Sequence, residues 1–268
     1  MLVTLWLAAC ASAPPEPPPP PADKQLPVPG EAFLLRGHEA FLILPGQRDT
    51  EQPTPWVLYA PTLRGLPSAA ESWMFERFLA AGIAIAGIDV GESYGNPEGC
   101  ALYDVLHEHL VRHRGLSPRP VLLARSRGGL MTLSWAADRA DRVAAWAGIY
   151  PVCDLRSYPG LAKAAGAFAT TAEGLVAELP QHNPIERLAG LAGHRVPMFA
   201  IHGDRDQLVP LAENSGALAE RMRALGGEVE LHVLPGLGHD MNRAFFTSEA
   251  LVAFVLRQAR GTRGPRAR

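Results

Sequence analysis

The sequence predicts an α/β fold in which a mostly parallel sheet of eight strands is flanked by helices. From residue 31 onward, apolar runs of strand length alternate with amphipathic runs of helical length, a pattern typical of a parallel sheet covered by helices. Some strand-like runs are apolar throughout, as expected of strands buried on both faces. A chain of 268 residues, 47% hydrophobic and 19% charged, suits one large domain with a sizeable core.

The first part of the alternation contains four predicted strands and one helix. Residues 31–37 and 38–46 predict two strands joined by a tight turn, which makes an antiparallel start. The next strand is expected over 55–62. A helix follows over 68–82, because its large apolar residues recur at helical spacing and a glycine ends the run. The apolar run 83–90 then predicts a strand buried on both faces.

A glycine-rich loop over 91–99 leads into the next predicted helix, 100–115. The apolar run 120–124 is the following strand, and it enters a short polar turn. An amphipathic helix over 128–140 leaves that turn, and 142–150 predicts the strand after it.

The last predicted elements are strands over 196–203 and 227–236 and a terminal helix over 248–260. Residues 154–192 break the alternation with short helical stretches and prolines, so we expect a lid-like insertion over a site. Residues 261–268 predict a basic tail.

The N-terminal residues do not have the pattern of a fold. In residues 1–10 a short apolar run ends in Leu-Ala-Ala-Cys10, which resembles the lipobox of bacterial lipoprotein signal peptides, where the cysteine is lipidated. No Lys or Arg precedes this run, and the alternative is a frayed cytoplasmic terminus. Residues 11–30 are rich in proline and predict an extended tether. We expect an extracytoplasmic protein, in the periplasm or at the cell surface, anchored to the membrane only through Cys10.

Composition and motifs exclude several classes of partner. A net charge of −2 argues against a nucleic-acid-binding face. The chain has neither a G-x-G-x-x-G nor a G-x-x-x-x-G-K-[ST] loop, so we expect no nucleotide cofactor. His109 and His113 stand four apart on one helix, a spacing that can hold zinc, but no third ligand is evident and we expect no metal. Cys100 and Cys153 either pair or remain two free thiols. Oligomeric state is not indicated.

The stretch VLLARSRGGL, residues 121–130, carries the first candidate for chemistry. A nucleophile on a sharp strand-to-helix turn needs small residues two positions away on each side, as in G-x-S-x-G. Ala124 and Gly128 supply them around Ser126. Such a turn lifts the serine hydroxyl above the sheet edge, toward the N–H groups of the next helix. The alternative is a serine that only caps that helix.

Two downstream loops favour the catalytic interpretation. Asp204 and Asp206 come directly after a predicted strand, and His239 lies in a glycine-bounded loop after the last one. Histidine can accept the serine proton and return it to a leaving group, and a buried carboxylate orients the imidazole. The order serine, acid, histidine is that of the α/β-hydrolase arrangement.

From about residue 31 to 260 the chain therefore resembles serine hydrolases of the α/β-hydrolase superfamily. The stretches HGDRDQLVP and GLGHD closely match the acid and histidine loops of the dienelactone hydrolase, thioesterase and prolyl-oligopeptidase-like groups. In those groups the second aspartate of H-G-D-x-D is the triad acid, which implies Asp206. Asp204 is then expected to shape the loop.

The resemblance also implies an oxyanion hole built from the N–H of the residue after the nucleophile, Arg127, and one from the loop after the third strand. Pro61 in that loop has no N–H, so the expected donor is Thr62 or, failing that, Leu63. Glucuronoyl esterases also place arginine after the serine, where its side chain assists the oxyanion. Here Arg127 either does so, favours substrates with a carboxylate, or is a surface arginine. Tyr94 either lines the pocket or packs it.

These observations predict a hydrolase that cleaves carboxylic esters of small molecules or polymers through an acyl-enzyme, without a cofactor. One alternative is a prolyl-oligopeptidase-like peptidase, although those enzymes usually carry a propeller domain and no segment here has that length. Another is a non-catalytic binding protein on the same fold.

Overall fold

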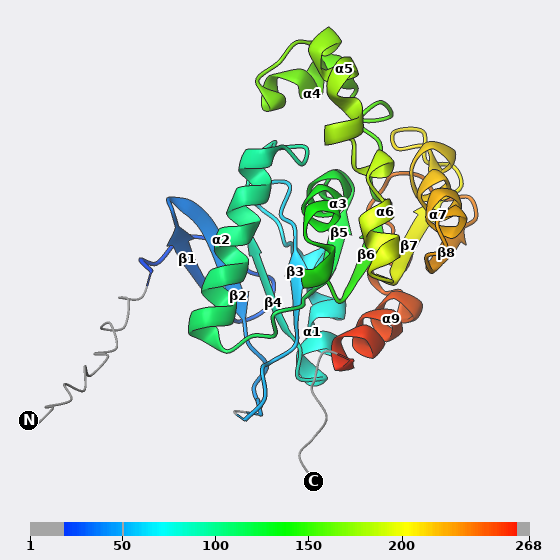
Figure 1. Ribbon diagram of the computed structural model, residues 1–268. Helices are drawn as coiled ribbons and strands as arrows, with labels where there is room; N and C mark the ends of the chain where they lie inside the picture. Colours follow the sequence, from blue (N-terminus) through cyan, green and yellow to red (C-terminus); the bar gives the residue numbers. More distant parts are fainter. Residues whose placement is uncertain (1–18, 50, 262–268) are drawn as a thin grey trace, which may run out of the picture.

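Eight strands form one sheet in the computed structural model, which describes residues 19–49 and 51–261 (Figure 1). In chain order the strands are β1 (Glu31–Leu35), β2 (His38–Ile43), β3 (Trp56–Tyr59), β4 (Ala84–Ile88), β5 (Val121–Arg125), β6 (Ala145–Ile149), β7 (Met198–Gly203) and β8 (Val229–Leu234). Their order across the sheet is β1-β2-β4-β3-β5-β6-β7-β8. Strand β2 is antiparallel to β1 and β4, and the other neighbouring pairs are parallel. The predicted α/β sheet with an antiparallel start is confirmed.

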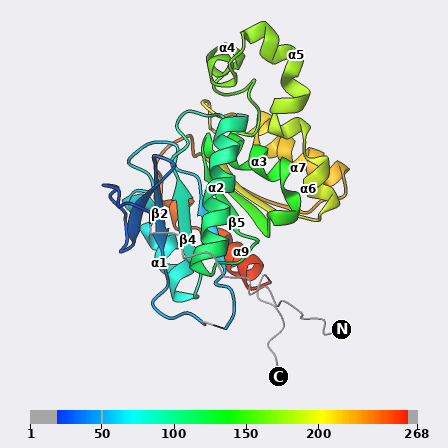
Figure 2. The same cartoon turned by 60° about the vertical axis from the view of Figure 1, so that its left-hand side comes forward.

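Helices cover both faces of this sheet (Figures 1 and 2). One layer holds α1 (Ser72–Ala80), α8 (Arg243–Phe246) and α9 (Glu249–Arg260), and the other holds α2 (Pro97–Arg114), α3 (Gly128–Asp138), α6 (Ala189–Gly193) and α7 (Ser215–Ala224). Strand β3 shows how the sequence feeds two cores. Trp56 and Leu58 join the core with α2 and α3, whereas Val57 and Tyr59 join the core with α1 and α9. Alternate side chains point to opposite faces, so a strand buried on both faces is apolar throughout.

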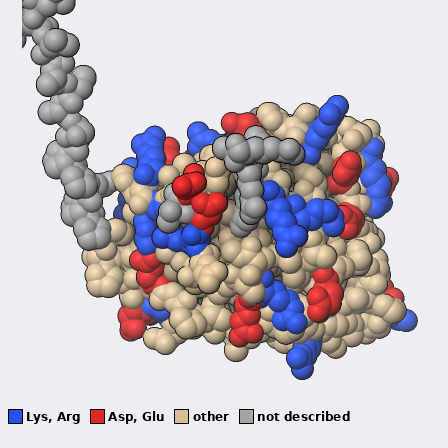
Figure 3. All heavy atoms as spheres, turned by 90° about the horizontal axis from the view of Figure 1, so that it is seen from below, with Lys and Arg blue, Asp and Glu red and all other residues tan. Residues whose placement is uncertain are grey.

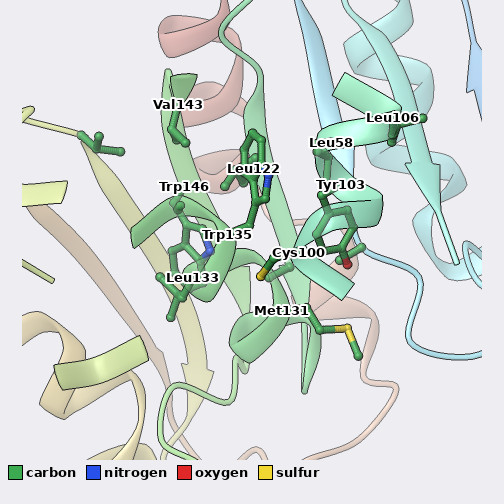
Figure 4. Close-up of a cluster of buried hydrophobic side chains, with 14 of the residues drawn as sticks. Leu58, Cys100, Tyr103, Leu106, Leu122, Met131, Leu133, Trp135, Val143 and Trp146 are labelled. Carbon is green, nitrogen blue, oxygen red and sulfur yellow. The ribbon is translucent and has the colours of Figure 1, made fainter. Parts of the chain in front are cut away.

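Trp135 and Trp146 are buried in the core between the sheet and α3 (Figure 4). The indole N–H of Trp146 donates to Thr132 Oγ1 at 2.8 Å, and that of Trp135 donates to Asp104 Oδ1 at 3.0 Å. Both rings therefore bury large apolar areas without leaving a donor unpaired. This packing fixes α3, which begins two residues after Ser126.

Several element boundaries differ from those expected. Helix α2 begins at Pro97, because the Asn96 side chain accepts from the Gly99 N–H as an N-cap and proline suits the first helical position. The strand expected over 142–150 is shortened, because residues 140–142 form a 3₁₀ turn. Helix α7 was not among the predicted elements.

The insertion over 154–192 contains α4 (Leu161–Ala164), α5 (Ala172–His182) and short 3₁₀ turns, and its end enters α6. Both views place α4 and α5 beyond the carboxyl ends of the parallel strands (Figures 1 and 2). The insertion has a small core of its own, which includes Leu175 and Leu179 and also Leu130 of α3. The Asn96 side-chain amide donates to Ala167 O at 2.6 Å and joins the insertion to α2. A lid role stays a prediction.

The proline-rich segment differs from a free tether in its described part. Leu34 N donates to Pro20 O at 2.7 Å, and Ala22 N donates to Ala32 O at 3.0 Å, so the segment runs along the free edge of β1. Lys24 is buried and its Nζ donates to Arg64 O at 2.9 Å. An extended chain offers carbonyls to an edge strand even where prolines lack N–H groups, which explains this pairing. Cys10 and the segment 1–10 lie outside the described residues, as do 262–268 of the expected tail.

The two cysteines of the described residues do not form a disulfide. Cys100 and Cys153 are two buried free thiols, and burial raises the pKa of both, that of Cys100 to about 12.

On the face seen from below, basic and acidic side chains are interspersed (Figure 3). Within the described residues, no helix is both long and apolar enough to cross a bilayer.

Candidate active site

Ser126 lies on the turn between β5 and α3, in a backbone conformation that side chains rarely adopt. Its φ is +50°, and the strain is held by two hydrogen bonds: Ser126 N donates to Ile149 O at 3.0 Å, and Val152 N donates to Ser126 O at 2.8 Å. Gly129 makes the turn sterically feasible, since a Cβ there would lie 2.3 Å from Val152 O. This geometry matches the sharp turn expected from the A-x-S-x-G pattern.

The structure brings Ser126, His239 and Asp206 together in one hydrogen-bonded chain. Ser126 Oγ lies 2.9 Å from His239 Nε2, and His239 Nδ1 lies 2.7 Å from Asp206 Oδ2. The Asp206 side chain is fully buried, and the His239 side chain is 14% exposed. A carboxylate here can fix the tautomer and orientation of the imidazole, which leaves Nε2 free to accept the serine proton.

Backbone N–H groups hold the Asp206 carboxylate in place. Its Oδ1 accepts from Val209 N at 2.8 Å and from Leu208 N at 3.1 Å. Asp204 does not reach His239 but accepts from Gly236 N at 2.6 Å, in the loop that leads to the histidine. The two aspartates therefore lie as expected, one against the imidazole and one shaping the loops.

A buried polar network lies beside the imidazole on the α1 side. Glu71 is fully buried, and its Oε1 accepts from Arg125 Nη1 and from Tyr59 Oη, each at 3.0 Å. The Tyr150 ring centroid lies 4.4 Å from that of His239. Burial raises the pKa of Tyr150 to about 12, although the nearby Arg125 guanidinium acts in the opposite direction. Because this pKa is far above 7, the phenol is neutral at neutral pH. The network braces Arg125, the residue before Ser126, and the Tyr150 ring that lies against His239.

The expected oxyanion donors lie around the first turn of α3. Thr62 is 7% exposed, and a Cβ added to Gly128 would lie 3.4 Å from its methyl group, so the two loops are in contact. Among the described residues, the backbone N–H groups of Thr62 and Arg127 donate to no backbone carbonyl in the turns and loops. Such N–H groups can donate hydrogen bonds to an oxyanion as it forms. The Leu63 side chain, by contrast, is 56% exposed.

The Arg127 side chain spans two loops rather than extending into solvent. Its Nη2 donates to Thr62 O at 3.3 Å and forms an ion pair with Glu92 at 3.1 Å. Burial, together with the nearby Glu92 carboxylate, raises the pKa of Tyr94 to about 12. Tyr94 is 4% exposed and packs in the core of the insertion, which favours a packing role over a lining one.

Sequence reasoning missed the groups that support this site. The sequence pattern of Ser68 and Glu71 indicates the capping box that they form at the start of η1 (Ala69–Glu71). No pattern in the neighbouring sequence indicates that Glu71 pairs with Arg125. Arg125 closes an otherwise apolar strand, which marks it as a charge needing a buried partner. His202, in the fully buried strand β7, is a similar signal. In the described ranges, no group of three or more His, Cys, Asp or Glu side chains is arranged to hold a metal ion.

The profile described as the prolyl oligopeptidase family matches residues 117–261, more than half of the chain. A comparison with curated protein sequences finds no match. Solved structures with the α/β-hydrolase fold are similar to the chain. A puromycin-hydrolysing peptidase from Mycobacterium tuberculosis is 17% identical with a TM-score of 0.68, and the match covers 86% of this chain and 40% of that one.

Dipeptidyl peptidase 4 from Porphyromonas gingivalis is 14% identical with a TM-score of 0.66, over 87% of this chain and 35% of that one. A truncated carbohydrate esterase from gut microbiota is 16% identical with a TM-score of 0.68, over 90% of this chain and 99% of that one. The chain thus spans 35% to 40% of the length of these two peptidases. At such identities the likeness shows the fold, and the predicted α/β-hydrolase fold is confirmed.

Proposed function

The chain belongs to the prolyl oligopeptidase family of α/β-hydrolase-fold serine hydrolases, and from that premise we propose that it cleaves carboxylic esters through an acyl-enzyme on Ser126. The observation that carries the proposal is the hydrogen-bonded chain from Ser126 Oγ through His239 to the buried Asp206 carboxylate. Serine alone is a weak nucleophile at neutral pH, and an adjacent imidazole with an oriented tautomer activates it.

In the proposed reaction, Ser126 Oγ attacks the ester carbonyl while His239 Nε2 takes the hydroxyl proton. The carbonyl oxygen becomes an oxyanion that accepts hydrogen bonds from the N–H groups of Arg127 and Thr62. The C–O bond to the alcohol then breaks, and His239 returns the proton to the departing oxygen. In the second half, His239 takes a proton from water as the water oxygen attacks the acyl carbonyl carbon. The resulting tetrahedral intermediate breaks its bond to Ser126 Oγ, His239 returns the proton to that oxygen, and the acid is released.

Asp206 supports both steps by stabilising the imidazolium that forms when His239 holds the proton. Its charge is buried, so its attraction for the imidazolium is screened less than at the surface. Its position is fixed before the reaction by the Leu208 and Val209 N–H groups. The carboxylate need not reorganise as charge develops, which is the condition for electrostatic stabilisation.

An ester substrate makes the smaller demand on this geometry. An alcohol is a better leaving group than an amine, which must be protonated as it departs, so amide cleavage requires tighter control of the leaving nitrogen. The likeness to the carbohydrate esterase over 90% of the chain supports the ester proposal. Peptide hydrolysis is the second candidate, favoured by the family match over residues 117–261.

A matched pair of substrates separates the two candidates. The p-nitrophenyl ester and the p-nitroanilide of N-acetylalanine share one acyl group and differ in the bond cleaved. We expect turnover of the ester, little turnover of the anilide, and loss of at least about 10³-fold in ester kcat in Ser126→Ala. An anilide kcat/KM equal to that of the ester would favour the peptidase. Ester turnover unchanged in Ser126→Ala would contradict the proposed nucleophile.

We also propose that the protein is extracytoplasmic and anchored through a lipid on Cys10, as the lipobox-like sequence indicates. Its substrates would then be esters of small molecules or polymers outside the cytoplasm. The test is the distribution of the full chain between membrane and soluble fractions. Membrane recovery that Cys10→Ser abolishes is expected, and an equal distribution of the two proteins would refute the anchor.

A further inference from the structure

A second histidine, His202, touches the proposed catalytic acid from inside the protein. It lies in β7, and its side chain is fully buried. Its Nε2 lies 3.2 Å from Asp206 Oδ2 and 2.8 Å from Val209 O, and its Nδ1 lies 2.8 Å from Ser215 Oγ at the start of α7. The imidazole thus joins a strand, the acid loop and a helix at the carboxylate that faces His239.

These contacts determine the tautomer of His202. Nε2 faces a carbonyl oxygen and a carboxylate oxygen, which are both acceptors, so the proton must lie on Nε2. Burial lowers the pKa of His202, which leaves the ring neutral at neutral pH. Nδ1 is then an acceptor, and the Ser215 hydroxyl donates to it. The Ser215 hydroxyl therefore satisfies Nδ1 in the tautomer that the two acceptors at Nε2 require.

We infer that His202 is a positioning residue: its Nε2–H donates to Val209 O at 2.8 Å and faces Asp206 Oδ2 at 3.2 Å, which holds the acid loop and its carboxylate toward His239. This role rests on the proposed function of Asp206 as the triad acid. Oδ1 is already held by two backbone N–H groups, whereas Oδ2 lies 2.7 Å from His239 Nδ1 and 3.2 Å from His202 Nε2. Because His202 carries no charge, it orients the carboxylate without cancelling the negative charge that stabilises the His239 imidazolium.

A matched pair of substitutions isolates that hydrogen bond. Gln and Met are similar in length, but only the Gln amide can donate from the place that Nε2 occupies. We expect His202→Met to lower the kcat for a p-nitrophenyl ester roughly tenfold to a hundredfold, because a misplaced catalytic group costs rate out of proportion to its movement. KM should change less than about twofold, since no substrate contact is lost. His202→Gln should keep kcat within about fivefold of wild type.

Three readouts distinguish positioning from a general structural role. Thermal unfolding of both variants shows whether kcat follows stability. The downfield NMR resonance of the proton between His239 Nδ1 and Asp206 should shift in His202→Met and remain near its wild-type position in His202→Gln. Equal kcat values in the two variants, or a loss that only parallels Tm, would overturn the inference while the wild-type esterase activity upheld the proposed function. An inactive wild type would overturn both.

Ser215 supplies a second test if His202→Met does not fold. Ser215→Ala removes the hydroxyl that donates to Nδ1, and Ser215→Thr keeps a hydroxyl at the same position. We expect Ser215→Ala to lower kcat several-fold at unchanged KM, because Nδ1 loses its hydrogen-bond donor and the imidazole is then held less firmly beside the acid loop. Ser215→Thr should retain the wild-type NMR resonance. Wild-type kcat and an unshifted NMR resonance in Ser215→Ala would contradict the positioning role of His202.

Discussion

The Asp204 carboxylate accepts a hydrogen bond from the Gly236 backbone N–H at 2.6 Å, which joins the loop of the proposed catalytic acid to the loop of the histidine. Arg205 N donates to Leu237 O at 2.9 Å in the same contact. Gly203 permits this approach, since a Cβ there would lie 2.1 Å from Leu237 O. The position of His239 relative to Asp206 is therefore set by contacts between two loops, one made by the Asp204 side chain and one between backbone groups.

This relationship predicts different results at the two aspartates. Asp206→Asn should lower kcat about 10³- to 10⁴-fold, because an amide cannot hold the imidazole in the correct tautomer or stabilise its protonated form. Asp204→Asn should cost less than about tenfold, since the amide oxygen still accepts from Gly236 N. Steady-state kinetics on one p-nitrophenyl ester compares the two isosteric variants. A larger loss in Asp204→Asn would assign the acid to Asp204 instead.

Breaking the buried Glu71–Arg125 pair should strongly destabilise the folded protein. Removing one partner leaves the other charge buried, and such losses lower the free energy of unfolding by about 3–5 kcal/mol. We expect this from Arg125→Met in urea unfolding, with partial recovery in the double variant Glu71→Gln/Arg125→Met. The exposed pair Arg77–Glu249 is the control, and Arg77→Met should change the free energy by less than about 1 kcal/mol. Equal effects at both sites would contradict the buried-pair interpretation.

The Arg127–Glu92 ion pair predicts how substrate charge affects turnover. Glu92 is half exposed and already balances the guanidinium, so a substrate carboxylate must compete with it. Glu92→Gln should raise kcat/KM for the mono-p-nitrophenyl ester of adipic acid about fivefold relative to neutral p-nitrophenyl hexanoate. Arg127→Met should lower the same ratio. If both variants change the two substrates equally, Arg127 has no role in substrate charge.

Two buried histidines predict a loss of stability toward acid pH. Burial is the main cause that lowers the pKa values of His107 and His202 below their usual 6.5. Below about pH 6.5 the unfolded chain therefore binds more protons at these sites than the folded chain does. Their contribution to stability is present above that pH and declines as pH falls toward the folded pKa values.

The free energy of unfolding should consequently be lower at pH 5.5 than at pH 7.5, as measured by urea titration at both values. His107→Gln should show a smaller decrease than wild type, since it removes one of the two groups. His113→Gln, at an exposed position on the same helix, is the control and should keep the wild-type decrease. An identical decrease in His107→Gln would remove His107 from the explanation.

The order of strands and helices could be predicted because alternate burial on two faces leaves a periodic trace in the sequence. The meeting of Ser126, Asp206 and His239 could also be anticipated, since all three follow strands and the carboxyl ends of parallel strands share one edge. The start of α2 was predictable in hindsight from Asn96 and Pro97, which are N-cap and first-turn signals. Helix α7 has good helix formers and an apolar pair, Leu218 and Met222, at helical spacing.

The supporting shell of the site could not be predicted in the same way. Glu71 and Arg125 are 54 positions apart, and no local pattern shows that they meet under Tyr150. The contact between Lys24 and the Arg64 carbonyl is similarly remote, which is why the proline-rich segment was expected to be free up to residue 30. Such pairs depend on how layers pack, and side-chain periodicity records only which face each residue occupies.

The most direct test of the central claim is the intact mass of the protein after treatment with a fluorophosphonate, beside the Ser126→Ala variant. The reagent phosphonylates a serine whose proton an adjacent base removes. We expect one adduct on wild type, located at Ser126 by peptide mapping, and none on the variant. An unmodified wild type, or an equal adduct on both proteins, would show that the hydrogen-bonded Ser126 is not the nucleophile.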